Sequence, residues 1–154
     1  MKKINWKVLV FSLIAVFLVA SFGSLFTTGN VESDWYIENK PAITPPNWVF
    51  GPAWTTLYIL IAISLYFAWT NSKKKEKMNI GLIYGINLVL NASWSYFFFG
   101  LQNPVLGLVC LSLIWLTIWG MIYFAWRVDR RAAWLLVPYL LWVTFAGVLN
   151  AGFL

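Results

Sequence analysis

Polar residues recur at four-residue spacing inside one of the apolar segments of the chain. Asn87, Asn91 and Ser95 would occupy successive turns of one helix face. A row of amides facing lipid would lack hydrogen-bond partners, at a cost of several kcal/mol for each group. We therefore expect this row to face the inside of a helix bundle, either as hydrogen bonds between helices or as part of a binding site.

Two further rows carry tryptophan. Trp54 and Tyr58 lie at i and i+4 near the start of one apolar segment. A second row shares the four-residue spacing near the C-terminus: Pro138, Trp142, Ala146 and Asn150. Indole and phenol rings can stack on a large, flat, hydrophobic ligand, and indole N–H and amide groups can supply a few hydrogen bonds. An aromatic belt at a membrane surface would explain Trp54 and Tyr58 as well, and the pattern alone leaves both interpretations open.

Other chemistries are excluded or disfavoured by composition. The chain has no histidine and one cysteine, Cys110, which excludes a zinc site built from Cys and His, a disulfide framework and an imidazole-ligated haem. The 11 basic and five acidic residues lie outside the uncharged apolar segments, so serines and threonines there have no base to activate them. The absence of charged residues from these segments also argues against an ion-coupled transporter. We expect no metal and no required cofactor.

Five apolar segments of about 20 residues must position these side chains. They cover residues 6–26 (uncharged from Val8), 52–71, 78–99, 105–126 and 132–153. With 61% hydrophobic and 10% charged residues, the chain has the composition of a membrane protein, and the short alternating segments of a β-barrel are absent. The sequence predicts an all-α membrane protein, one domain over residues 1–154 with a bundle of five transmembrane helices. A cleaved signal peptide over residues 2–23 is the less favoured alternative.

Basic residues predict the orientation. They gather at residues 2–7, 73–77 and 127–131, which five crossings place on one side of the membrane, whereas Lys40 is alone on the other side. The positive-inside rule then predicts a cytoplasmic N-terminus and a C-terminus outside. Because the positive charge lies in these short clusters, we expect a lipid bilayer and no nucleic acid as partner.

The connections between the segments are unequal. The first, at about 27–51, is by far the longest, and its prolines restrict the backbone, which predicts an ordered loop that acts as a lid. Pro52 is expected in the first turn of the second helix. In the third segment, Gly81 and Gly85 form a small-xxx-small motif, which either makes a homodimer or packs a neighbouring helix of the same chain.

Several of these motifs together resemble one family. Trp35-Tyr36 and the stretch KPAITPPNWVFGPAW at 40–54 are similar to the signature loop of the translocator protein family, also called TspO/MBR, tryptophan-rich sensory protein or peripheral benzodiazepine receptor. NASWSYFFFG at 91–100 resembles the third helix of that family, and the stretch PYLLWVTFAGVLN at 138–150 resembles its fifth. The resemblance covers about residues 21–150.

The resemblance implies a five-helix bundle with a ligand cavity capped by the first loop. It implies binding of tetrapyrroles such as protoporphyrin IX and of isoquinoline-type drugs, homodimers, and a role in tetrapyrrole handling or stress sensing. Some bacterial members are linked to light-dependent porphyrin breakdown; Trp54 and Trp142 match the tryptophans of that chemistry, and Ala146 matches an alanine that affects ligands. The C-terminal cholesterol motif of animal members is absent, which puts cholesterol binding at that site in doubt.

Pattern and resemblance together predict a set of ligand-binding residues: Tyr36, Pro45, Trp48, Phe50, Trp54, Tyr58, Asn91, Trp94, Phe98, Trp142, Phe145 and Ala146. The expected ligand is a porphyrin or another hydrophobic small molecule. The alternatives are a light- and oxygen-dependent enzyme that uses Trp54 and Trp142 to degrade protoporphyrin IX, and a passive translocator of hydrophobic ligands. The expected location is a bacterial cell membrane, which the chain crosses several times.

Overall fold

The computed structural model describes residues 4–154 and is helical, with no strand in that range. Five helices among these residues are long and apolar enough to cross a membrane, which confirms the predicted fold class. The long helices are α1 (Trp6–Thr27), α3 (Asn47–Asn71), α4 (Lys74–Ser95) and α5 (Pro104–Val128), and the fifth crossing consists of α6 (Arg130–Trp134) and α7 (Val137–Ala151). The loop after α1 contains a 3₁₀ turn (Asn30–Glu32) and α2 (Asp34–Asn39), and a π-helical turn (Tyr96–Gly100) extends α4.

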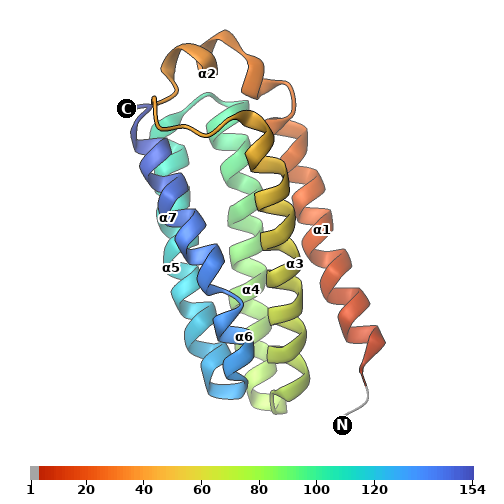
Figure 1. The fold of residues 1–154 in the computed structure, drawn as a ribbon. Helices are drawn as coiled ribbons and strands as arrows, with labels where there is room; N and C mark the ends of the chain where they lie inside the picture. The colour runs from red at the N-terminus through yellow and green to blue at the C-terminus, as the bar shows by residue number, and fades with distance from the viewer. Residues whose placement is uncertain (1–3) are drawn as a thin grey trace.

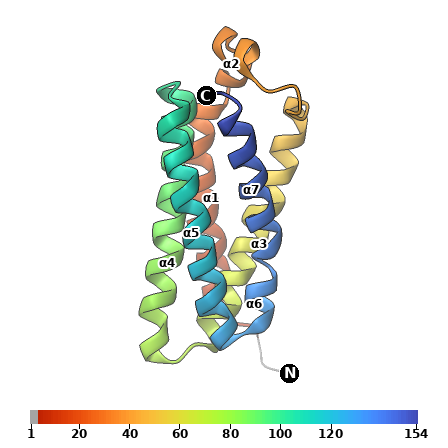
Figure 2. The same cartoon turned by 90° about the vertical axis from the view of Figure 1, so that its left-hand side faces the viewer.

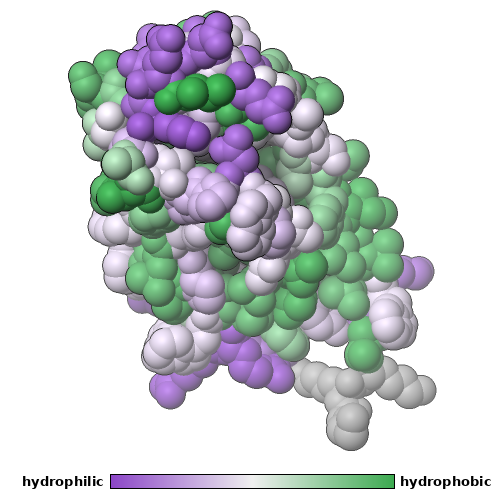
Figure 3. All heavy atoms as spheres, turned by 45° about the horizontal axis from the view of Figure 1, so that its top comes forward, coloured by the Kyte–Doolittle hydropathy of each residue, from purple (hydrophilic) through white to green (hydrophobic). Residues whose placement is uncertain are grey.

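The long helices run along one another, and α2 lies across the end of the bundle that is opposite the N-terminus (Figure 1, Figure 2). Hydrophilic residues gather over this lid and at the opposite end, whereas the sides between them are largely hydrophobic (Figure 3). The described basic clusters, at Lys7, 73–77 and 127–131, lie at the end of the bundle away from the lid. Lys2 and Lys3 lie outside the described residues. The direction of the termini across the membrane remains a prediction.

The half of the bundle away from the lid has a close-packed core. Its fully buried side chains include Ile61 of α3, Ile80 of α4, Ile118 and Met121 of α5, and Leu136 between α6 and α7. Small residues let α6 approach α3 closely: Ser64 Oγ donates to the Ala132 carbonyl at 2.7 Å and lies 2.6 Å from the Tyr84 hydroxyl. Since this half is solid, the space for a ligand has to lie in the half beneath the lid.

The second crossing starts earlier than predicted. α3 begins at Asn47, with Pro46 as its N-cap, so Pro52 lies in the second turn and the prediction of a helix start at Pro52 is wrong. A proline there removes the hydrogen bond to the carbonyl four residues before it, that of Trp48. Trp48 is exposed at the end of the helix, where the membrane surface is expected and water can reach this carbonyl.

The last crossing is interrupted rather than continuous. α6 ends at Trp134, and Pro138 lies in the first turn of α7, where its missing N–H needs no partner. The helix is therefore interrupted at Leu135 and Leu136, just before Pro138. The other helices begin and end within a few residues of their predicted limits.

The two glycines of the small-xxx-small motif have different surroundings. A Cβ atom on Gly81 would lie 3.3 Å from the Trp69 ring of α3, so this glycine serves close packing within the chain. A Cβ atom on Gly85 would meet nothing within 4 Å. Gly85 is exposed beside Leu82 and Ile86, and a homodimer through this face of α4 remains a prediction.

Candidate ligand-binding cavity

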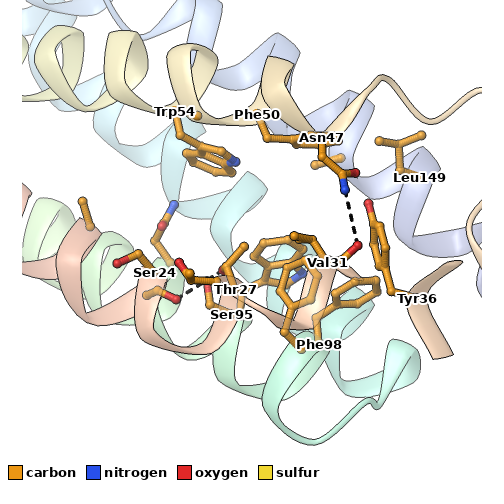
Figure 4. Close-up of a pocket in the computed structure, with 18 of the residues that line it drawn as sticks. Ser24, Thr27, Val31, Tyr36, Asn47, Phe50, Trp54, Ser95, Phe98 and Leu149 are labelled. Carbon is orange, nitrogen blue, oxygen red and sulfur yellow. Dashed lines mark hydrogen bonds between the residues drawn. The ribbon is translucent and has the colours of Figure 1, made fainter. Parts of the chain in front are cut away.

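A cavity of about 750 Å³ lies between the helices beneath the lid (Figure 4). This volume is within the range of small-molecule sites, about 300–1,000 Å³. Its lining comes from α1, the loop with α2, α3, α4 with its π-helical turn, α7 and the C-terminal residues. Nine of the twelve predicted ligand-binding residues belong to the lining: Tyr36, Phe50, Trp54, Tyr58, Asn91, Trp94, Phe98, Trp142 and Ala146.

One wall of the cavity is formed by aromatic rings of α3 and α7. Trp54 stacks on Tyr58, with ring centres 5.5 Å apart, and meets Trp142 edge-on at 6.4 Å. Phe50 contacts Trp142 at 5.9 Å. These residues follow the four-residue rows of the sequence, and the bundle brings the two rows together.

The opposite wall is formed by the end of α4. Trp94 and Phe98 stack with ring centres 5.3 Å apart and an angle of 15° between their planes. Figure 4 shows Phe98 across the cavity from Trp54 and Phe50. Asn150 accepts a hydrogen bond from Trp94 Nε1 at 3.2 Å and so fixes the indole. A flat ligand could therefore lie between two aromatic walls.

The lid is attached to the bundle by aromatic contacts rather than by charges. In α2, Trp35 contacts Phe98 at 5.5 Å, and Tyr36 contacts Phe99 at 5.7 Å and Phe153 at 5.5 Å. Burial raises the pKa of the Tyr36 phenol, which therefore stays neutral at physiological pH. Trp35 belongs to the lid itself and is absent from the cavity lining.

A chain of hydrogen bonds forms the polar floor of the cavity. Tyr58 donates to Asn91 Oδ1 at 2.8 Å, Asn91 Nδ2 donates to the Tyr139 hydroxyl at 2.9 Å, and Tyr139 donates to Asn87 Oδ1 at 3.0 Å. Asn87 Nδ2 continues the chain to Thr117 Oγ1 at 2.9 Å. The asparagine row of α4 therefore faces inward as predicted. Asn87 forms hydrogen bonds between helices. Asn91 forms such bonds too, and it also lines the cavity.

Two polar atoms at the cavity have no hydrogen-bond partner among the described residues. They are the indole Nε1 of Trp142 and the hydroxyl of Thr44, and both atoms are buried. A buried donor without a partner is unfavourable by about 1–3 kcal/mol.

The sequence patterns missed the contribution of α1. Ser21, Ser24 and Thr28 lie on one face of this helix and line the cavity, as does Thr55 of α3. These four residues are exposed, so the cavity opens sideways between α1 and α3. The spacing of hydroxyls in an otherwise apolar helix was the available signal. Glu32 is the one charged residue in the described lining.

Three predicted residues lie elsewhere. Trp48 is 74% exposed, and it and Phe145 line a more open groove on the outside of the bundle between α3 and α7. Trp142 lines both this groove and the cavity. Pro45 belongs to neither lining, although it lies in the lid. Ligand contact by any of the predicted residues remains a prediction.

The sequence is similar to known proteins over nearly its whole length. The model of the TspO/MBR family matches residues 11–154. A "Tryptophan-rich protein TspO" of Archaeoglobus fulgidus is 43% identical over 143 residues, which cover 92% of each chain. "Protein CrtK" of Rhodobacter capsulatus is 36% identical over 90% of this chain and 89% of its own. The human "Translocator protein" is 36% identical over 83% of this chain and 77% of its own. With a family model that spans almost all of the sequence and a five-helix fold that agrees with it, the chain belongs to the TspO/MBR family.

Proposed function

We propose that the chain binds a porphyrin such as protoporphyrin IX, or a ligand of similar size and flatness, in the cavity beneath the lid. The observation that carries this proposal is an apolar space of about 750 Å³ between two aromatic walls. Trp54 and Trp142 line it on one side, and Trp94 and Phe98 line it on the other. The names of relatives, tryptophan-rich sensory protein and translocator protein, agree with the handling of a small molecule at a membrane.

Recognition would rest on stacking and on a few hydrogen bonds. Ser24 and Thr55 line the cavity, and their hydroxyls are the groups that could meet the polar edge of the ligand. The described lining has no lysine or arginine, so carboxylates of a porphyrin would point toward the opening rather than bind a cation. Tetrapyrrole handling or stress sensing would follow from occupancy of this site.

Iron should contribute little to binding. The chain has no histidine, and the Cys110 thiol lies outside the cavity lining and donates to the Leu90 carbonyl at 3.2 Å. We expect protoporphyrin IX and haem to bind with affinities within about threefold of each other, less than 1 kcal/mol. Tryptophan-fluorescence titration in detergent measures this. A preference for haem of about tenfold or more would contradict recognition by stacking.

The same titration locates the site. The Trp54→Phe and Trp142→Phe variants are each expected to lose part of the ligand-dependent quenching, because these indoles would contact the ligand. Trp119→Phe is the matched control, since Trp119 is 49% exposed on the outside of α5. If the control lost as much quenching as the cavity variants, the ligand would bind elsewhere.

A light-dependent enzyme is the second candidate, and the Trp54–Trp142 contact at 6.4 Å favours it. An indole of this pair would give one electron to light-excited protoporphyrin in the cavity, and the reduced porphyrin would pass an electron to molecular oxygen. The indole radical would then take an electron back from the porphyrin, so that the porphyrin is oxidised by one electron overall and oxygen is reduced by one. We expect the double variant Trp54→Phe/Trp142→Phe to reduce light-dependent product formation about tenfold or more. Binding should weaken far less, because phenylalanine retains a ring. Product analysis under light and in the dark measures this, and an unchanged yield would eliminate the enzymatic candidate.

A passive translocator is the remaining alternative. The sideways opening between α1 and α3 would give a hydrophobic ligand a route from the bilayer, and no group in the described lining except Glu32 could couple movement to an ion.

A further inference from the structure

At the end of the bundle away from the lid, two guanidinium groups, one from α5 and one from α6, lie over exposed aromatic rings of α5. The guanidinium carbon of Arg127 is 4.3 Å from the centre of the Tyr123 ring, and that of Arg130 is 5.2 Å from the centre of the Trp126 ring. Tyr123 and Trp126 are three residues apart on α5 and share a face. Trp134 of α6, which lies beside this end of α5 (Figure 2), contacts Trp126 at 6.1 Å.

Neither guanidinium has a carboxylate partner among the described residues. The one salt bridge in residues 4–154 joins Arg131 and Asp129 at 2.8 Å. Asp129 also accepts a hydrogen bond from Asn71 at 2.8 Å, so it is occupied by groups other than Arg127 and Arg130. A guanidinium that lies over a ring keeps its N–H edges free, and these edges match the oxygens of a phosphate.

The helix presents a matching apolar surface toward the centre of the bilayer. Leu116 and Trp119 precede Tyr123 on the exposed side of α5. Toward the end of α5 away from the lid, the side chains of Leu116 and Trp119 therefore come first. The rings of Tyr123 and Trp126 follow, and the two guanidinium groups come last. The same order is found in one leaflet of a phospholipid bilayer, where the acyl chains are followed by the interfacial region and then by the phosphates.

We propose that Arg127 and Arg130, with the rings of Tyr123, Trp126 and Trp134, form a binding site for an anionic phospholipid of the adjacent leaflet. The two cations hold the phosphate, and the acyl chains lie along α5. A phosphatidylglycerol headgroup carries a net negative charge, whereas the choline of phosphatidylcholine neutralises its own phosphate. The site therefore selects the anionic lipid.

The chain offers a control of equal charge. Lys74 and Lys75 lie at the same end of the bundle, are exposed, and have no aromatic ring contact. A diffuse attraction between the basic end and an anionic membrane would depend on lysines and arginines alike. Lipid binding at a specific site formed by the stacked guanidinium groups would depend on the two arginines and not on the lysines.

Native mass spectrometry of the detergent-solubilised protein, titrated with dilute phosphatidylglycerol or phosphatidylcholine, tests the proposal. We expect wild type to retain phosphatidylglycerol preferentially, and R127Q/R130Q to lose about tenfold in its affinity for this lipid. K74Q/K75Q, with the same change in charge, should change this affinity less than about twofold. Inorganic phosphate at the same concentration should not displace the lipid, because it lacks acyl chains.

Several results would overturn the proposal. They are equal losses in the arginine and lysine variants, the absence of any preference in wild type, and displacement by inorganic phosphate. Circular dichroism of both double variants must match wild type, which is expected because all four side chains are exposed. R127K/R130K separates charge from geometry: the affinity for phosphatidylglycerol should still fall severalfold, since lysine lacks the planar fork. Full retention by this variant would contradict the role of the stacked guanidinium groups.

Discussion

Replacing Tyr139 by phenylalanine is expected to lower the free energy of unfolding by about 2 kcal/mol. The Tyr139 hydroxyl is fully buried, accepts from Asn91 Nδ2 at 2.9 Å and donates to Asn87 Oδ1 at 3.0 Å. Its removal leaves two buried amide groups, those of Asn91 and Asn87, each without one of its partners. The two losses together exceed the roughly 0.6 kcal/mol typical of one hydrogen bond between transmembrane helices.

Thermal unfolding in detergent measures this effect. A loss of 2 kcal/mol corresponds to a decrease in Tm of about 4–8 °C for a chain of this size. Tyr123→Phe is the matched control, because Tyr123 is 51% exposed and its ring remains available to Arg127. Tyr58→Phe should have an intermediate effect, since it removes one bond to Asn91. If Tyr139→Phe were as stable as the control, the buried chain of hydrogen bonds would not hold the helices together.

The sequence was sufficient to predict the five crossings and the inward row of α4. Crossing a bilayer requires length and hydrophobicity, and both are visible in the sequence without knowledge of neighbours. The position of Asn87 and Asn91 follows equally from local information, because an amide facing lipid has no partner. Their partners could not be predicted in this way. Tyr139 is 52 residues away from Asn87, and its contact depends on where α7, which packs against α5, lies relative to α4.

The misplacement of Trp48 has a local cause. With the helix expected to start at Pro52, Trp48 belonged to the lid and was expected to line the cavity beneath it. Because α3 starts at Asn47, Trp48 and Trp54 are on one helix, six residues and about 240° apart. Trp54 faces the cavity, so Trp48 faces outward. Prolines at 45 and 46 make an extended segment predictable, but they do not determine how soon afterwards the helix begins.

The contribution of α1 depended on a weaker signal. Ser and Thr in an apolar helix usually donate to backbone carbonyls of the preceding turn, as Ser24 does to the Ser21 carbonyl at 2.7 Å. Their presence is therefore compatible with a lipid-facing helix. Only the position of α1 beside α3 places these hydroxyls at the opening of the cavity.

Replacing Ala146 by tryptophan is expected to weaken binding of protoporphyrin IX about 100-fold or more, equivalent to about 2.7 kcal/mol. Ala146 lines the cavity on α7, one turn from Trp142. A large side chain at this position can enter the existing space, so it removes volume available to the ligand with little strain in the packed half of the bundle. Fluorescence titration measures the affinity, and an unchanged Tm would show that the bundle is retained.

Val148→Trp provides the comparison for this variant, because Val148 is on the same helix, is 55% exposed and does not line the cavity. It adds the same indole to α7 and to the fluorescence signal but should leave the affinity within about twofold of wild type. The two variants separate loss of cavity volume from a general effect of a larger side chain on α7. Wild-type affinity in Ala146→Trp would mean that the porphyrin binds outside the cavity. Such a result would contradict the proposal that the aromatic walls beneath the lid hold the ligand.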